Sequence, residues 1–226
     1  AGFLLTGAVT NALNMASFTA EEAARLKPYM RLAEKLGSFA GQATQSAVKE
    51  IVVSYEGLCA ELNCKPLSAI MLQGLLRPLM EGVNMVNAPA LARQRNINVK
   101  ELRGGDAGAY QSLITLEVKT ENQRRAVKGT LFNDEPRVVE IKGITMDARL
   151  APNMLYITNR DKPGLVGALG TILGNAGVNI ATFHLGRAEE GGDAIALIEV
   201  DGTPPEKVLN DIAALEHVVQ IIPMKF

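Results

Sequence analysis

Apolar and polar residues alternate most clearly between Ser112 and Thr120. This period of two predicts a strand with one buried face. Leu113, Thr115, Glu117 and Lys119 share one face, and Ile114, Leu116 and Val118 share the other. Shorter runs predict further strands at 47–55, 99–103, 125–131 and 137–142, and apolar positions at helical spacing predict helices at 67–80 and 83–95. Residues 43–150 are therefore expected to form a mixed α/β domain.

Residues 1–42 show a different pattern. Thr19 and Glu22 have the spacing of a capping box that opens a helix, and Pro28 is expected to kink that helix or to start a new one. The apolar stripe that follows is short, and consists of Leu32, Leu36 and Phe39. This stretch is interpreted as a connector rather than as a domain.

The last seventy or so residues predict a third arrangement. A short apolar strand at 154–157 is followed by the turn Asp161–Gly164 and by a helix from Leu165 that closes at Gly177. Strands at 178–187 and 194–200, a helix at 204–215 and a strand at 217–223 complete the series. The order β-α-β-β-α-β is that of a ferredoxin-like fold. The expected fold class of the whole chain is α+β.

The Asp161–Gly164 turn carries the most informative chemistry in the sequence. The first turn of a helix leaves backbone N–H groups unpaired, and these attract a small carboxylate. Asp161 stands beside that position and offers an anion for an ammonium group. A carboxylate site next to an ammonium site is what an amino-acid sensor requires.

Composition narrows the function further. The chain has 226 residues, a net charge of −1 and a pI near 6.2, so charge gives no reason to expect nucleic acid or a membrane surface as a partner. No apolar run reaches the length of a membrane span. Two cysteines, Cys59 and Cys64, suit a reducing cytoplasm. The chain lacks an initiator Met, and a fragment or processed form is expected.

The residues that could suggest catalysis or a cofactor have structural interpretations. Gly164, Gly167 and Gly170 follow a G-x-x-G-x-x-G spacing, which differs from a dinucleotide loop and is interpreted as close packing of a helix on a sheet. His184 and His217 are interpreted as surface or edge histidines, and the two cysteines have neither redox nor zinc spacing. We therefore expect a non-catalytic chain that holds no metal and no cofactor.

Several motifs in order resemble the regulatory end of long-form D-3-phosphoglycerate dehydrogenases. They are Gly7–Met15, Leu32–Gly37, Val86–Pro89, Gly129–Phe132 and the C-terminal sensor. The resemblance implies the end of a catalytic part and a helical connector at 1–42, an intervening allosteric substrate-binding domain at 43–150 and an ACT domain at 151–226. It also implies that a full-length parent would use NAD, whereas this chain would not.

The resemblance further implies an effector site between the ACT domains of two subunits, and therefore self-association. Carried over by position, its residues are Asn159, Asp161, Gly164, Leu165 and Asn179. The expected ligand is L-serine or a similarly small amino acid. Some serine binders carry His at the position of Asn159 and Asn at that of Asp161.

Some relatives also bind a phosphorylated anion in the middle domain through basic residues. Arg137 and Arg149 are the candidates for such a site in this chain, because arginine makes forked contacts to phosphate. Two other functions stay open at this point. One is the regulatory part of an iron–sulfur L-serine dehydratase, and the other is a free-standing amino-acid-binding module.

Overall fold

The structure is a computed structural model that describes residues 20–226. The chain separates into two compact units, with the division between Arg137 and Val138. The motif at 7–15 and Thr19 of the expected capping box lie outside the described residues.

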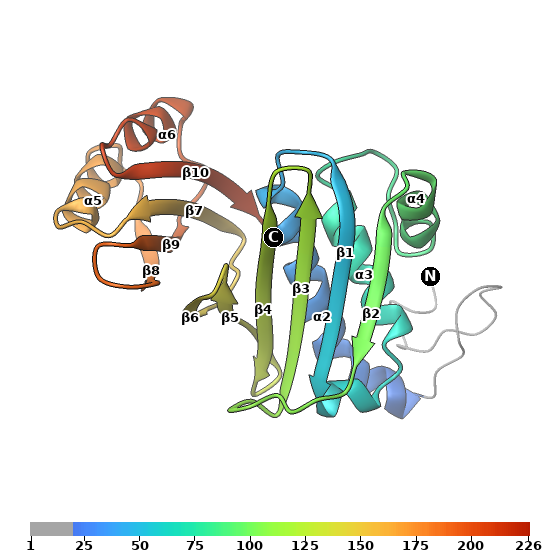
Figure 1. The fold of residues 1–226 in the computed structure, drawn as a ribbon. Helices are drawn as coiled ribbons and strands as arrows, with labels where there is room; N and C mark the ends of the chain where they lie inside the picture. Colours follow the sequence, from blue (N-terminus) through green and yellow to red (C-terminus); the bar gives the residue numbers. More distant parts are fainter. Residues whose placement is uncertain (1–19) are drawn as a thin grey trace. The chain divides into compact units, whose positions relative to one another are not determined.

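The first unit is a sheet covered by helices (Figure 1). Its strands lie in the order β2-β1-β3-β4, with β1 parallel to β2 and antiparallel to β3, and with β3 antiparallel to β4. The strands are β1 (Val48–Gly57), β2 (Asn98–Arg103), β3 (Ser112–Thr120) and β4 (Arg124–Phe132), and the helices are α2 (Ala20–Ala43), α3 (Lys65–Leu76) and α4 (Ala88–Gln94), with a 3-10 turn at Leu58–Glu61. The strands predicted at 47–55, 99–103, 112–120 and 125–131 thus correspond to β1, β2, β3 and β4.

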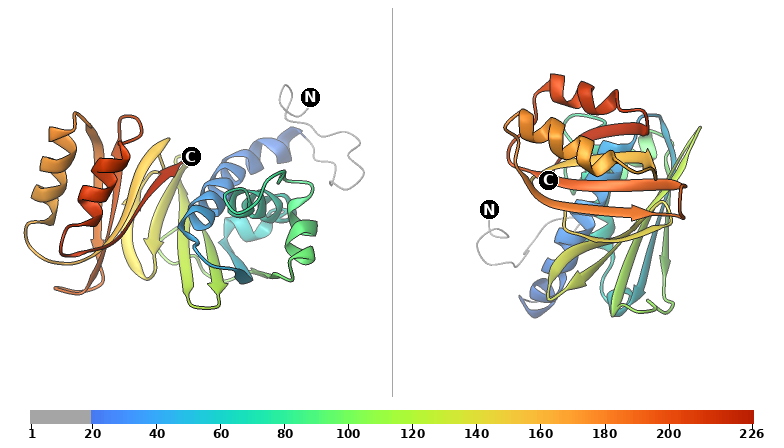
Figure 2. Two further views of the ribbon diagram at one scale, coloured as in Figure 1. Left: turned by 90° about the horizontal axis from the view of Figure 1, so that it is seen from above. Right: turned by 90° about the vertical axis from the view of Figure 1, so that its left-hand side faces the viewer.

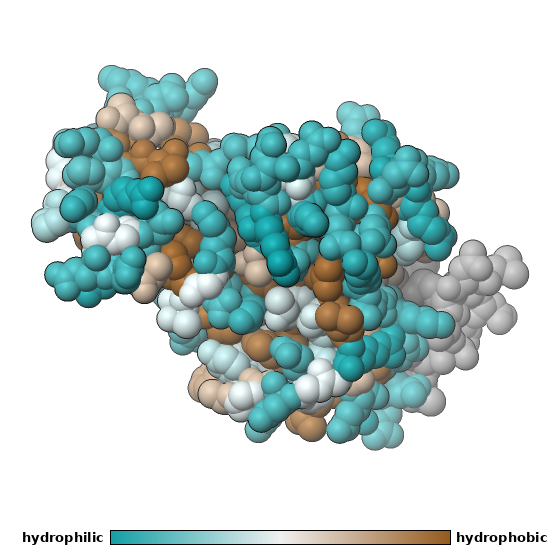
Figure 3. Space-filling model, viewed as in Figure 1, coloured by the Kyte–Doolittle hydropathy of each residue, from teal (hydrophilic) through white to brown (hydrophobic). Residues whose placement is uncertain are grey.

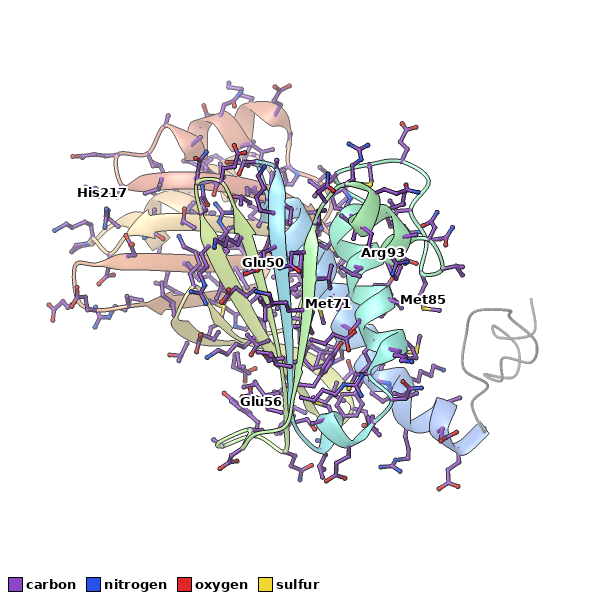
Figure 4. The ribbon with its side chains drawn as sticks, turned by 45° about the vertical axis from the view of Figure 1, so that its right-hand side comes forward. Glu50, Glu56, Met71, Met85, Arg93 and His217 are labelled. Carbon is purple, nitrogen blue, oxygen red and sulfur yellow. The ribbon has the colours of Figure 1, made fainter. Side chains whose placement is uncertain are left out.

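The helices cover the sheet face that the alternation marked as apolar. Ile51 and Val53 of β1 and Ile114 of β3 are fully buried. Met71 of α3 is also fully buried and lies on the helical side of the sheet (Figure 4). Tyr55 ends this apolar row, and its hydroxyl is 2.8 Å from that of Ser68 on α3. A buried tyrosine keeps its polar end hydrogen-bonded, so the core has no unpaired hydroxyl at this point.

The opposite face of this sheet is polar. Glu50 accepts hydrogen bonds from Lys100 at 2.7 Å and from Asn98 at 3.0 Å, which ties β1 to the edge strand β2 (Figure 4). Arg124 pairs in the same way with Glu117 across β3 and β4. Hydrophilic residues predominate on the side of this unit that Figure 3 shows, with apolar residues scattered among them.

Helices α2 and α3 approach each other unusually closely because glycines stand at their contact. A Cβ atom added at Gly37 would lie 2.1 Å from the Met71 carbonyl oxygen, and one at Gly41 would lie 2.3 Å from that of Leu75. Gly74 of α3 makes the reciprocal approach, with 2.6 Å to the Glu34 carbonyl oxygen. The contact is therefore made by backbone against backbone, and any side chain would separate the helices.

Helix α2 differs from what the sequence suggested. It runs unbroken through Pro28, so the proline neither ends nor restarts the helix. Leu32, Leu36 and Phe39 are buried within the first unit, whereas a connector was expected here. The physical reason is that the neighbouring Gly37 and Gly41 let α3 cover a stripe that is too short to form a core alone.

The second unit holds the β-α-β-β-α-β arrangement (Figure 2). Its antiparallel sheet has the order β10-β7-β9-β8. The elements are β7 (Asn153–Arg160), α5 (Leu165–Asn175), β8 (Ile180–Arg187), β9 (Asp193–Val200), α6 (Glu206–Ala213) and β10 (Val218–Lys225). Both helices pack on one face of the sheet over Leu155, Ile157 and Ile198. The ferredoxin-like prediction is confirmed.

The other face of this sheet is covered as well, which the sequence did not predict. Tyr156 and Leu197 point away from the helices and are buried. A hairpin of β5 (Glu135–Ile141) and β6 (Ile144–Ala148) precedes β7, and β6 packs against β8 and β9. Gly186 of β8 makes the closest approach, since a Cβ atom there would be 2.6 Å from the Thr145 carbonyl oxygen.

Strand β6 was not predicted from the sequence. It is joined to β5 by the two-residue turn Lys142–Gly143, in which φ is 53° at Lys142 and 81° at Gly143. Two positive φ angles define a tight hairpin turn that asparagine or glycine usually occupies at the first position. Lysine rarely adopts this conformation, so the dipeptide Lys142–Gly143 is a weak predictor of a hairpin turn.

Candidate functional site

A pocket of about 440 Å³ lies in the second unit at the start of helix α5. The end of β7, the first turn of α5 and the turn between β8 and β9 form its walls. Its lining residues are Asn159, Asp161, Lys162, Pro163, Gly164, Leu165, Val166, Gly167, Leu185, Arg187, Glu190 and Gly191. The structure thus brings four of the five predicted effector residues together.

The start of helix α5 supplies unpaired donors to this pocket. Gly164 is the N-cap with φ of 98°, no side chain caps the helix, and its first turn holds no acidic residue. Ala168 donates to the Gly164 carbonyl oxygen at 2.9 Å. The amides of the residues between them have no helical partner. Most helices satisfy these groups with a capping side chain, so this helix start is suited to an external anion.

Asn159 supplies an unpaired acceptor. It was expected in the loop after a short strand, but β7 continues through it, and the residue is only 3% exposed. The Nδ2 group donates to the Arg160 carbonyl oxygen at 2.9 Å, while Oδ1 is buried without a hydrogen-bond partner. An unsatisfied buried polar atom costs about 1–3 kcal/mol. A ligand that donates a hydrogen bond here would remove that cost.

Asp161 is held by the turn between β8 and β9. Its Oδ2 accepts from Arg187 Nη1 at 2.8 Å and from the Gly191 amide at 3.2 Å, and its own amide donates to the Gly192 carbonyl oxygen at 2.8 Å. The hydrogen bond from Arg187 is the main cause that lowers the pKa of Asp161. Because the folded-state pKa is depressed, this pairing is present at neutral pH and is lost as the pH falls through the lowered value.

Asn179 lies away from this pocket within one chain. It follows helix α5, and eleven helical residues span about 16 Å from one end of the helix to the other. Its Nδ2 donates to Asp201 Oδ2 at 2.9 Å. Asn179 can therefore reach a pocket of this kind only if a second copy of the chain presents it.

The two arginines of the predicted anion site stand in different surroundings. Arg137 is half-buried on β5, and Arg149 is exposed just after β6. They fall on opposite sides of the division between the units. The anion site stays a prediction.

Arg187 and Gly191 are pocket residues that the sequence did not suggest. Both follow the Asn179 segment and come back to the pocket only through the antiparallel pairing of β8 with β9. The sequence feature that bears on them is the Glu190–Asp193 turn, which indicates where the chain reverses direction between the two strands.

The remaining titratable candidates lie outside the pocket. His184 is half-buried on the edge strand β8, and His217 stands 4.0 Å from Glu216. Cys59 and Cys64 are buried free thiols, and burial raises the pKa of Cys59 to about 11. Residues 20–226 contain no cluster of metal-ligating side chains. None of their helices is both long and apolar enough to cross a membrane.

The fold and pocket define an ACT-domain protein, and a family model of the ACT domain matches residues 153–217. A second model, described as the D-3-phosphoglycerate dehydrogenase intervening domain, matches residues 25–142, which is just over half of the chain. The chain therefore belongs to the D-3-phosphoglycerate dehydrogenase family. The intervening-domain match begins within helix α2, in agreement with the packing of that helix.

Curated relatives agree with the family models. D-3-phosphoglycerate dehydrogenase of Bacillus subtilis is 31% identical over 215 residues, which cover 94% of this chain and 41% of the relative. The enzyme of Methanocaldococcus jannaschii is 32% identical over 212 residues, which cover 93% and 40%. The chain thus spans about two fifths of the length of these relatives. These matches favour the dehydrogenase family over the two alternatives that the sequence left open.

Proposed function

We propose that this chain is the amino-acid-sensing regulatory region of a D-3-phosphoglycerate dehydrogenase, under feedback control by L-serine. The observation that carries the proposal is the buried, unpaired Oδ1 of Asn159 beside the uncapped start of helix α5. The dehydrogenase activity named for the relatives, and the NAD that it would use, are proposed for a longer protein that contains this chain.

The binding mode follows from the donors and acceptors in the pocket. The carboxylate of the amino acid binds the free amides at the start of α5, where the helix dipole favours negative charge. Its ammonium group donates to Asn159 Oδ1 and to Oδ1 of Asp161, the oxygen that Arg187 and Gly191 do not contact. Pro163 and Val166 leave room for a small side chain such as that of serine.

Replacing Asp161 with alanine is expected to weaken L-serine binding by more than tenfold, because the ammonium group loses its only anionic partner. A factor of ten corresponds to about 1.4 kcal/mol. Isothermal titration calorimetry of the whole chain with L-serine measures the effect, with glycine and D-serine as comparison ligands. His217→Ala is the control, since His217 lies outside the pocket and outside edge strand β8, and the variant should leave the affinity unchanged. Equal affinities of Asp161→Ala and wild type would exclude this site.

Self-association is proposed to complete the site by bringing Asn179 of a second copy to the pocket. Strands β8 and β10 form the edges of the sheet in the second unit. Edge strand β10 contains Pro223, which has no amide to donate, whereas β8 contains no proline and exposes Leu185. Edge β8 is therefore the one suited to a second copy.

Light scattering at micromolar concentration is expected to show dimers or larger assemblies of the wild-type chain. Leu185→Lys should shift the population toward monomer, because it places a charge on the exposed part of β8. Val219→Lys is the matched control on β10, where Val219 is also exposed. A wild-type chain that remains monomeric would contradict both the association and the shared site.

A further inference from the structure

The ion pair between Arg187 and Asp161 joins two walls of the pocket that are distant in sequence. Arg187 ends β8, and Asp161 stands between β7 and α5. Both residues line the pocket, and their side chains are 56% and 22% exposed. Exposed ion pairs of this kind contribute little to stability, because water and salt screen them. Stability alone is thus a weak reason for placing an arginine on this wall.

We infer that Arg187 is a positioning and specificity-determining residue of the pocket, an inference that rests on the proposed amino-acid-binding function. Arg187 holds Oδ2 of Asp161 together with the Gly191 amide, so that Oδ1 is the oxygen left to accept the ligand ammonium. It also fixes a positive charge on the wall. The pocket therefore selects amino acids whose side chains are neutral and discriminates against those with a second ammonium group.

The charges around the pocket support this selectivity. Asp161 and Glu190 are its acidic lining residues, and Lys162 and Arg187 are its basic ones. The α-ammonium group of a ligand uses Asp161, and Asn159 adds a neutral acceptor. A second ammonium group on the ligand would meet the guanidinium of Arg187 and the helix start, both of which are positive. A hydroxymethyl side chain meets no such repulsion.

The specificity role of Arg187 can be distinguished from a purely structural role in stabilising the β8–β9 hairpin. An arginine that only strengthened the β8–β9 turn would change the stability of the second unit when removed, but it would not change the ratio of affinities for two ligands of equal shape. It would also leave the preference between neutral and cationic side chains unaltered. The ratio of affinities is therefore the decisive measurement.

The experiment compares L-serine with L-2,3-diaminopropionate, in which an ammonium group replaces the serine hydroxyl. Both are titrated calorimetrically into the whole chain at a pH that keeps both amino groups of the second ligand charged. We expect wild type to prefer L-serine by about tenfold or more, as for a like-charge contact in a partly desolvated site. Arg187→Gln should lower L-serine affinity by about tenfold and reduce the preference to within about threefold.

Two further variants sharpen the comparison. Arg187→Lys keeps the positive charge but not the forked geometry, so it should retain the preference for L-serine while losing part of the affinity. Arg160→Gln is the matched control, because Arg160 is about as exposed as Arg187 and pairs with Asp193, and neither residue lines the pocket. It should change neither affinity. An NMR titration should also show the pKa of Asp161 rising toward its ordinary value in Arg187→Gln.

Failure of the proposed function and failure of the role of Arg187 would give different results. A wild-type chain that binds no amino acid overturns the proposed function and this inference together. A wild-type chain that binds L-serine, with an Arg187→Gln variant that keeps both the affinity and the preference, overturns the inference alone. If Arg187→Gln weakens both ligands equally, the specificity role is overturned, since Arg187 would then position Asp161 without setting the preference between the two ligands.

Discussion

Gly37→Ala is expected to lower the free energy of unfolding of the first unit by about 3 kcal/mol, at the upper end of what overpacking a core usually costs. The added Cβ atom would lie 2.1 Å from the carbonyl oxygen of Met71, which is a backbone atom and cannot rotate away. Helices α2 and α3 must separate, and the apolar stripe that includes Leu36 loses contact with its partner helix. Gly41→Ala should act in the same direction.

Gly170→Ala is the matched control for this substitution. Gly170 is also helical, but a Cβ atom there meets nothing within 4 Å. Alanine should therefore stabilise the second unit slightly, by about 0.5–1 kcal/mol, because glycine loses more backbone entropy on folding. Urea unfolding followed by circular dichroism measures both variants, and hydrogen exchange of the α2 and α3 amides assigns the change to the first unit. Equal midpoints for Gly37→Ala and wild type would show that the helices can move apart freely.

The sequence predicted those parts of the fold whose signals are local. Strand β3 was placed without error because its alternation reports burial on one side of a sheet. The glycines show the limit of such reasoning. Gly167 and Gly170 were interpreted as helix–sheet contacts, but both are exposed and nothing lies near their Cβ positions. Gly37 and Gly41 do make a close contact, but the sequence did not predict it. A glycine within a helix does not indicate which neighbouring element approaches it.

The same distinction applies to the pocket. Asn159, Asp161, Gly164 and Leu165 are near one another in the sequence, and a strand, a turn and a helix start suffice to group them. The partners of Asp161 could not be predicted, because the pairing of β8 with β9 decides that Arg187 returns to the pocket. The burial of Asn159 Oδ1 likewise depends on β7 continuing past the expected end of the strand.

Asn159→Leu is expected to weaken L-serine binding by about tenfold or more, since a hydrogen bond to a charged group contributes about 1.5–3 kcal/mol. Leucine has nearly the same shape as asparagine but cannot accept a hydrogen bond from the ligand ammonium. The free energy of unfolding of the ligand-free chain should rise slightly or stay the same. The variant loses the bond from Nδ2 to the Arg160 carbonyl oxygen, but it also removes the unsatisfied Oδ1 and buries more apolar surface.

Calorimetry with L-serine and thermal unfolding without ligand test the two halves of this prediction. Asn153→Leu is the matched control, because Asn153 begins the same strand and lies outside the lining of the pocket. That variant should bind L-serine as wild type does. A residue kept only for the fold would give the reverse pattern, in which Asn159→Leu destabilises the chain while the remaining folded protein binds normally. That result would remove Asn159 from the site and would leave the buried oxygen without a ligand to explain it.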